Sequence, residues 1–333
     1  MINMLQSLEM LERKFPYLKQ LAIFLGFSIS TYAAIKYLRQ RKNMKLGKIK
    51  ELYFYPFKSL KGISVDTLEF TEFGVRYKGL VDRQFALIEV PKGNEYVDII
   101  NFKLEPKLVL VNVDIANDKE LTLSAEGMES IVLHEPSVNS NSVNVQLYDM
   151  KCEAKLCDPK VGAWFSKFLG YDKPLQVACL LKNAKESRRP IDFPPFKPYI
   201  DGSDKIAFHD SAHLLVVNEK SFRSFQKKFP FAQSQSILVF RPNVIMSDAE
   251  AWAEDSVKSD IAINNCRLTY FRPCDRCQGT CVDVESGELD PQRSTLLSLG
   301  KFRPKVLDSP TFGIVFMFRN FTNIHVGDTI YKA

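Results

Sequence analysis

The chain has 333 residues, of which 45% are hydrophobic and 25% charged, and this composition is typical of a globular protein rather than a disordered one. Residues 1–50 contain ten Lys or Arg and two Glu, whereas residues 51–333 contain 35 Lys or Arg and 37 Asp or Glu, so the net charge of +6 comes from the N-terminus. Because the remaining body lacks an excess of cations, we expect no nucleic-acid partner.

The first predicted element is a membrane-spanning signal anchor. The window YLKQLAIFLGFSISTYAAIKYL, Tyr17 to Leu38, is the most apolar of the chain. With a lysine near each end, it is long enough for a thin bilayer. Seven cations and no acid follow from Lys36 to Lys50, which favours a body on the cytosolic side and is the reverse of a cleaved signal peptide. We predict a tail over residues 1–17, the anchor over residues 18–38 and a basic linker over residues 39–46.

The length, hydrophobicity and flanking charges of this span also indicate which membrane it enters. A short, moderately apolar helix with basic flanks is typical of the mitochondrial outer membrane, and the endoplasmic reticulum is the alternative. A long amphipathic helix packed on the folded body is the competing interpretation of the same residues.

Short β-rich runs dominate the first half of the body. A helix is predicted over residues 160–170, with Val161, Trp164 and Phe165 on one face and Gly170 at its end. We expect these aromatic residues in the core. Alternation of apolar residues, interrupted by turn residues, predicts strands over residues 48–57, 84–90, 107–115, 120–125, 143–149 and 152–158.

A second set of strands begins near residue 174. The polar, Pro-rich stretch 186–198 is predicted to be a long surface loop that borders a site. No repeat, dinucleotide-binding, P-loop or hydrolase motif is present. We therefore expect two β-dominated units joined near residues 170–175, in an α+β fold that is mostly β. Strands are predicted over residues 174–181, 213–218, 236–246, 268–271, 312–318 and 325–332, with helices after Asn218 or Ser221 and over residues 292–302.

Three of the seven cysteines lie together in RPCDRCQGTC, residues 272–281, with the spacing C-x2-C-x3-C. A structural zinc site would need a fourth ligand, and the four histidines are scattered. An iron–sulfur cluster needs four cysteines in other spacings, and a Cys-x-x-Cys redox pair would open a helix, whereas a strand and turn are predicted here. The odd cysteine count also argues against a secreted disulfide scaffold.

A further interpretation of this cluster is a single thiolate that ligates a redox-active metal, because soft thiolate suits such metals. Arg272 and Arg276 would favour a neighbouring thiolate and could hold anionic groups of a cofactor. Cys274 and Cys281 are expected to be small buried apolar residues.

Seven stretches occur in an order that resembles the molybdenum cofactor sulfurase C-terminal (MOSC) superfamily. Together with the anchor, they resemble its mitochondrial, amidoxime-reducing branch. The resemblance covers about residues 47–333 and implies a β-barrel-like N-terminal domain over residues 47–172 and a MOSC domain with a few flanking helices over residues 173–333. The stretches are YPFKSLKG (55–62), DRQFALI (82–88), FRPNVIM (240–246), AEDSV (253–257), PCDRC (273–277), TCVDVESG (280–287) and VGDTIY (326–331).

The resemblance also implies the site residues and the cofactor, a molybdenum-bearing molybdopterin held between the two domains. Cys277 matches the cysteine that ligates the metal and is essential for catalysis. An anionic pterin phosphate needs cations and amides around it. The positions that match the pterin and phosphate contacts are Lys58, Ser59, Arg83, Ser211, Arg241, Asn243 and Arg276, together with Asp275 through its backbone.

The sequence departs from the superfamily pattern near these residues. Asp275 stands where a small hydroxyl residue is usual, Ala212 replaces a serine, and Val315 falls where a tyrosine is familiar. A further cysteine of the superfamily is absent at Ala249 or nearby. Asp210 and His209 are candidate proton relays.

The implied activity is the reduction of N-hydroxylated compounds, namely amidoximes, hydroxamic acids and N-hydroxylated bases, with nitrite as a further substrate. The implied electron donors are cytochrome b5 and NADH-cytochrome b5 reductase, and the implied state is a monomer. One alternative is a carrier of molybdenum cofactor or persulfide sulfur without reductase activity. Another is an adaptor that keeps the fold without activity.

Overall fold

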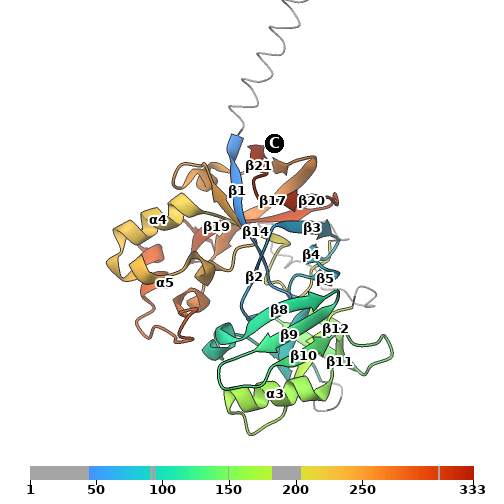
Figure 1. Ribbon diagram of the computed structural model, residues 1–333. Coiled ribbons are helices and arrows are strands. Elements are labelled where there is room, and N and C mark those ends of the chain that lie inside the picture. The colour runs from blue at the N-terminus through green and yellow to red at the C-terminus, as the bar shows by residue number, and fades with distance from the viewer. Residues whose placement is uncertain (1–44, 91–92, 94, 149, 182–203, 307) are drawn as a thin grey trace, which may run out of the picture. The chain divides into compact units, whose positions relative to one another are not determined.

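The computed structural model describes residues 45–90, 93, 95–148, 150–181, 204–306 and 308–333 (Figure 1). Residues 46–333 form one compact unit. The predicted anchor over residues 18–38 and the predicted loop over residues 186–198 lie outside the described residues. Within the described part of the chain, no helix is both long and apolar enough to cross a membrane.

A nine-stranded sheet contains both the N-terminal and the C-terminal strands of this unit. Its strand order is β14-β15-β1-β21-β16-β17-β19-β18, with β2 added on β1 and a further pairing of β14 with β19. The first strand therefore lies between segments about 200 and 280 residues away in the sequence. The bounds are β1 (Lys45–Phe54), β2 (Ile63–Val65), β14 (Leu214–Asn218), β15 (Val244–Ser247), β16 (Ile261–Ile263), β17 (Cys266–Asp275), β18 (Lys305–Val306), β19 (Ser309–Phe318) and β21 (Thr329–Lys332).

A closed five-stranded barrel is the second β element. It consists of β6 (Phe85–Glu89), β7 (Val97–Ile100), β11 (Ser142–Leu147), β12 (Met150–Leu156) and β13 (Leu175–Cys179). Two smaller sheets accompany it. They are formed by β8 (Asn112–Asn117), β9 (Glu120–Ser124) and β10 (Ile131–His134), and by β3 (Thr67–Thr71), β4 (Gly74–Tyr77), β5 (Leu80–Val81) and β20 (Asn323–His325).

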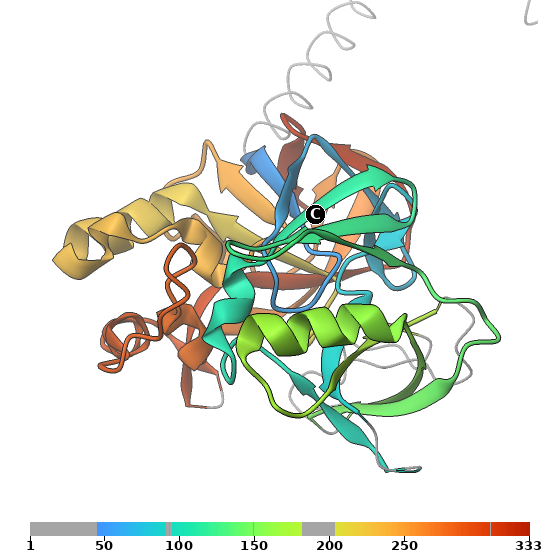
Figure 2. The same ribbon diagram turned by 60° about the horizontal axis from the view of Figure 1, so that its bottom comes forward.

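Three α-helices are described, α3 (Pro159–Leu169), α4 (Glu219–Lys228) and α5 (Ser294–Gly300). Asp158 caps α3 by accepting a hydrogen bond from the Lys160 backbone N–H, and Gly170 ends the helix with a φ of 74°. Figures 1 and 2 show α3 beside the barrel. A Cβ at Gly162 would collide with the Leu175 backbone, so glycine there lets the helix approach β13 closely. A mostly β, α+β fold is thus confirmed.

Two predicted strands are wrong in their first halves. Residues 107–110 belong to the 3-10 helix η1 (Pro106–Leu110), because Pro106 fixes φ and has no N–H to give to a sheet. Residues 237–240 form the 3-10 helix η4 (Ile237–Phe240), in which the Ser236 hydroxyl accepts a hydrogen bond from the Leu238 N–H. Strands begin only after these turns, at β8 and β15.

Three smaller predictions are refined by the structure. Asn218 rather than Ser221 caps α4. Residues 325–332 are shared between β20 and β21, with a turn between them. The segment after Cys277 begins with the 3-10 helix η6 (Gln278–Cys281) rather than a strand. The remaining 3-10 helices are η3 (Pro230–Ser234) and η5 (Ala253–Ser256).

Aromatic packing fixes the loop that follows β1. The Phe57 ring lies 6.2 Å from that of Phe85 and 5.4 Å from that of Phe165 between centroids, and all three rings are fully buried. Burial of each such side chain stabilises the fold by roughly 1.5–3 kcal/mol. The same contact is continued by the backbone, since the Lys58 N–H donates to the Phe85 carbonyl. Lys58 and Ser59 are therefore held against the barrel.

Candidate cofactor-binding site

One cleft, with a volume of about 400 Å³, brings together all nine residues that the sequence predicts for the site. They come from segments that are far apart in the chain: the loop after β1, the turn before β6, the segment before β14, the turn before β15 and the end of β17. These residues are Lys58, Ser59, Arg83, Ser211, Arg241, Asn243, Asp275, Arg276 and Cys277.

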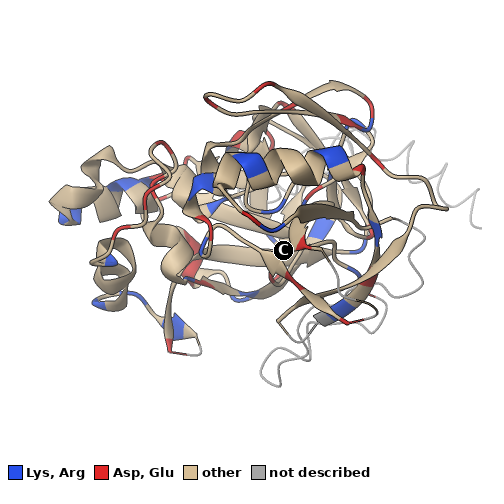
Figure 3. Ribbon diagram, turned by 90° about the horizontal axis from the view of Figure 1, so that it is seen from below, with Lys and Arg blue, Asp and Glu red and all other residues tan. Residues whose placement is uncertain are grey.

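The cleft has a large excess of positive charge. Elsewhere in the described part of the chain, Lys and Arg are interspersed with Asp and Glu (Figure 3). Like charges gathered in a partly buried cleft repel one another, and an anionic ligand offsets that repulsion. Among the described residues that line the cleft, six cations face two carboxylates, a formal excess of four. They are Lys58, Arg83, Lys103, Arg241, Arg272 and Arg276, against Asp210 and Asp275.

Three of the nine residues have a left-handed backbone. The φ angles are 77° at Ser59, 54° at Arg83 and 53° at Arg241. This conformation is unfavourable for residues with a Cβ and persists where the surroundings enforce it, often at functional sites. At Arg83, for example, the N–H donates to the Tyr55 carbonyl and the carbonyl accepts from the Phe208 N–H. These contacts fix the backbone at the position from which the Arg83 side chain lines the cleft.

A buried carboxylate, Asp82, lies behind the cleft and holds one of its cations, Arg83. It accepts hydrogen bonds from the Tyr55 N–H at 2.7 Å, from the Asn243 amide at 3.2 Å and from the Arg83 guanidinium. Burial by itself would raise the pKa of Asp82, but the charge of Arg83 and the contact with His209 lower it below its usual value. Asp82 is therefore ionised and fixes Arg83 in place.

His209 is the neutral neighbour of this carboxylate. Its Nε2 lies 3.2 Å from the Asp82 Oδ2, and its side chain is almost completely buried. Burial lowers the pKa of His209 to about 4, even though Asp82 acts in the opposite direction. The imidazole is thus uncharged at neutral pH.

The aromatic ring of Tyr55 lies against two of the arginines of the cleft, Arg83 and Arg241. The guanidinium carbon of Arg83 lies 4.9 Å from the ring centroid, and that of Arg241 lies 4.4 Å from it. Both distances are typical of cation–π contacts. A Cβ at Gly62 would overlap the Tyr55 ring, so the glycine leaves room for this stack. Tyr55 and Asp82 lie within quoted motifs, but sequence reasoning assigned neither a role.

The remaining cations of the predicted set differ in how they are held. Lys58 Nζ donates to the Phe208 carbonyl at 2.9 Å and to the Asp210 carboxylate at 2.8 Å. Arg276 directs its guanidinium to the Phe312 and Phe240 carbonyls. Arg276 therefore contributes charge to the cleft while its N–H groups bind backbone.

The three clustered cysteines are not equivalent. Cys277 is exposed and Cys274 is half-buried, and both line the cleft, whereas Cys281 is buried. Burial raises the pKa of Cys274 and of Cys281. Over the ranges that the structure describes, no group of three or more His, Cys, Asp or Glu is arranged to hold a metal ion. One accessible thiol in a cationic cleft fits the single-thiolate interpretation better than a zinc set.

The departures from the superfamily pattern lie partly in this cleft. Ala212, Val315 and Asp275 line it, and Asp275 forms an ion pair with Arg272. Ala249 is buried in the core and is not among the cleft residues.

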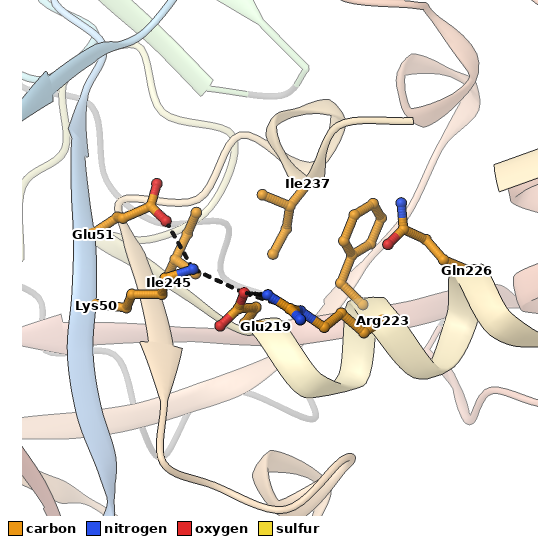
Figure 4. Close-up of a pocket in the computed structure, with 8 residues that line it drawn as sticks. Lys50, Glu51, Glu219, Arg223, Gln226, Ile237 and Ile245 are labelled. Atoms are coloured by element: carbon orange, nitrogen blue, oxygen red, sulfur yellow. Dashed lines mark hydrogen bonds and ion pairs between the residues drawn. The ribbon is translucent and has the colours of Figure 1, made fainter. Parts of the chain in front are cut away.

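A second pocket, of about 350 Å³, lies between β1 and α4 and contains none of the predicted residues (Figure 4). Its charges balance, since Lys50 and Arg223 both contact Glu219, and Lys50 lies 3.4 Å from Glu51. A pocket whose ion pairs are complete gives no preference for a charged ligand.

Comparison with known proteins agrees with this geometry. Residues 46–172 match the MOSC N-terminal beta barrel domain, and residues 203–331 match the MOSC domain. The chain belongs to the MOSC-domain superfamily, which confirms the resemblance carried by the seven motifs.

Several similar curated proteins are named mitochondrial amidoxime reducing component 1 or 2. The chain is 28% identical to mitochondrial amidoxime reducing component 2 of Bos taurus over 302 residues, which cover 88% of this chain and 85% of that protein. It is 28% identical to mitochondrial amidoxime-reducing component 1 of Danio rerio, over 89% of this chain and 88% of that one. The identity with the Homo sapiens component 1 is 29%, over 88% and 85% respectively.

Proposed function

We propose that the chain is a molybdenum cofactor-dependent reductase of N-hydroxylated compounds such as amidoximes, hydroxamic acids and N-hydroxylated bases. The observation that carries this proposal is the exposed thiol of Cys277 in the same cleft as a formal excess of four positive charges. The names of the relatives support the substrate class. The MOSC domain is named after a molybdenum cofactor enzyme, which supports the cofactor.

The residues present fit an anionic pterin cofactor. Ser59 Oγ and Arg241 Nη2 are buried and have no hydrogen-bond partner among the described residues. A buried donor without a partner costs roughly 1–3 kcal/mol, so these atoms favour a ligand that accepts hydrogen bonds. Lys58, Ser59, Arg83 and Arg241 would hold the phosphate and pterin, and the Cys277 sulfur would ligate the metal.

The bound cofactor would supply the two-electron chemistry that removes the oxygen of an N–O bond as water. The chain itself positions the reactants. Phe102, Val239 and Val315 give the cleft an apolar wall against which the carbon skeleton of a substrate can pack. Asp210 pairs with Lys58, whose charge lowers the pKa of the Asp210 carboxyl, so this group is ionised and cannot donate a proton at neutral pH.

The electron donors in this proposal are cytochrome b5 and NADH-cytochrome b5 reductase. An anchor over residues 18–38 would hold the body at the cytosolic face of the mitochondrial outer membrane, or of the endoplasmic reticulum in the alternative. A membrane shared with the donors would raise their effective concentration. The relatives are named mitochondrial, which supports the first location. The domain boundary at residues 172–173 and the monomeric state remain predictions, as does the absence of a nucleic-acid partner.

A carrier of molybdenum cofactor or of persulfide is the second candidate, because the exposed Cys277 could also bind and release a cargo. A carrier needs no turnover of N-hydroxylated compounds. The two functions are therefore separated by activity at equal molybdenum content.

The test is elemental analysis of the purified full chain together with turnover of benzamidoxime by a cytochrome b5 electron chain. We expect about one molybdenum per chain, and we expect Cys277→Ala to remain folded and to lose turnover by at least about a thousandfold, because the metal ligand is removed. Cys274→Ala is the matched control and should stay active. Molybdenum without turnover would favour the carrier, and zinc without molybdenum, or an active Cys277→Ala variant, would contradict the proposal.

A further inference from the structure

An ion pair precedes Cys277 in the chain, and its nearer member, Asp275, is two residues away in the sequence. Arg272 Nη1 donates to the Asp275 carboxylate, and both side chains line the cleft with Cys277. The Arg272 side chain is 10% exposed and that of Asp275 is 33% exposed, so the carboxylate is the more accessible partner. A ligand at the thiol therefore shares the cleft with one positive and one negative side chain, whose formal charges cancel.

The backbone keeps this pair in place. Both residues belong to β17, which pairs with β19 and has register shifts on either side of Pro273. Arg272 lies opposite Val315 and Asp275 lies opposite Thr311, while the Arg276 N–H donates to the Pro310 carbonyl. The irregular register brings the side chains at positions 272 and 275 together, which a regular strand would not do.

We propose that the Arg272–Asp275 pair is a specificity determinant that selects neutral N-hydroxylated substrates over small anions such as nitrite. The proposal rests on the proposed function. Asp275 cancels the charge of Arg272 in the cleft that contains the thiol, so an incoming anion gains no net attraction from this pair. Ala212 and Val315, the other two departures in the cleft, are apolar and add no donor for an anion.

The charge effect can be measured without any bound cofactor, because Cys277 itself reports the local potential. Iodoacetamide and iodoacetate alkylate a thiolate by the same displacement of iodide, but only iodoacetate is an anion. The ratio of their rate constants cancels any change in thiol ionisation and leaves the effect of charge. The full chain, prepared without molybdenum cofactor, is labelled near neutral pH, and the Cys277 peptide is quantified by mass spectrometry.

Asp275→Asn should raise the iodoacetate-to-iodoacetamide ratio about threefold, because one unit charge near the thiol is unmasked in a partly solvated cleft. Arg272→Gln should lower the ratio by a similar factor, and the double variant should return close to the parent value. Asp283→Asn, in the exposed turn after η6 and outside the cleft lining, is the charge control and should leave the ratio unchanged. Equal ratios in all variants, with equal melting temperatures, would overturn the proposal.

The consequence for catalysis is tested on the molybdenum-loaded chain. Asp275→Asn should raise kcat/KM for nitrite relative to that for benzamidoxime about threefold, and Arg272→Gln should lower that quotient. If the parent protein reduces benzamidoxime but no variant changes the quotient, the inference fails while the proposed function stands. If the loaded parent reduces neither substrate, the proposed function fails, and the alkylation ratios still decide whether the pair sets the charge at Cys277.

Discussion

The cofactor-binding cleft, with Asp82 behind it, and the second pocket, which contains Glu219, both combine arginine, lysine and carboxylate. They differ in how deeply these groups are buried and in whether their charges balance. Asp82 is fully buried among Arg83, Asn243 and Tyr55, whereas the Glu219 cluster lies at the surface, where the Arg223 side chain is 69% exposed. Solvent screens the second cluster, so each of its ion pairs contributes little. Buried, unbalanced charge is therefore a better indication of a ligand site than pocket size.

Among the substitutions that test this difference, Asp82→Asn should cause the largest loss of stability. The amide would place an NH2 group against the Arg83 and Asn243 donors, and Arg83 would lose its countercharge. Breaking a buried pair in this way typically costs about 3–5 kcal/mol of unfolding free energy. Urea unfolding at pH 7 measures the loss. Asp210→Asn, which removes a largely exposed carboxylate of the same cleft, is the matched control, and an equal loss there would show that burial is not the reason.

The pH dependence of stability tests the buried polar groups of the protein in a second way, through two histidines. His213 Nε2 lies 2.6 Å from the Lys205 carbonyl, and its Nδ1 accepts from the Phe318 N–H, an arrangement that requires the neutral imidazole. Burial lowers the pKa of His213 and of His209 to about 4. The unfolded chain, with histidine near pKa 6.5, binds more protons between these values, so stability is complete above about pH 6.5 and falls toward pH 4.

We expect each of these two histidines to account for up to about 3 kcal/mol of that loss. Urea unfolding at pH 7 and at pH 4.5 measures it. His213→Gln can still donate to the Lys205 carbonyl and does not titrate, so its stability should depend less on pH than that of the parent. A parent protein with equal stability at both pH values would contradict the assignment.

The Tyr55 ring contacts two neighbouring cations of the cleft, Arg83 and Arg241, so a substitution there tests how the cleft stabilises like charges. Each cation–π contact contributes about 0.5–1 kcal/mol or more when desolvated, so Tyr55→Leu should weaken cofactor retention by roughly tenfold. Tyr55→Phe should behave like the parent, since the Tyr55 hydroxyl has no hydrogen-bond partner among the described residues. Molybdenum content after dialysis is the measurement. A loss in the Phe variant equal to that in the Leu variant would assign the effect to the hydroxyl instead.

The sequence predicts the residues that face the cleft better than those that support them. Lys58, Arg83 and Cys277 stand in motifs whose order is diagnostic, and the structure brings them into one cleft. Tyr55 and Asp82 act through a ring stack and a buried hydrogen-bond set that join residues up to 186 positions apart, from Tyr55 to Arg241. No local pattern encodes such contacts.

Secondary structure shows the same limit at shorter range. The helix α3 is predictable because its apolar face, its cap and Gly170 agree. The apolar runs before β8 and β15 are not, because Pro106 and the Ser236 cap favour a 3-10 turn within a sequence that otherwise has strand character. Hydrophobicity indicates burial whether an apolar run forms a strand or a 3-10 helix. Only the residues that favour a turn, such as Pro106 and Ser236, distinguish these two conformations.

A substitution at Glu219, in the second pocket, should have the smallest effect on stability. Glu219→Gln removes the carboxylate that Lys50 and Arg223 share, at 2.8 Å from the Lys50 ammonium, but these cations can turn to water. Lys50 also keeps Glu51 at 3.4 Å. We expect a loss of less than about 1 kcal/mol in urea unfolding, shrinking further in high salt, and no change in molybdenum content. A loss as large as that of Asp82→Asn would mean that exposed and buried charge pairs in this protein stabilise it equally, and the criterion of buried, unbalanced charge for finding the site would fail.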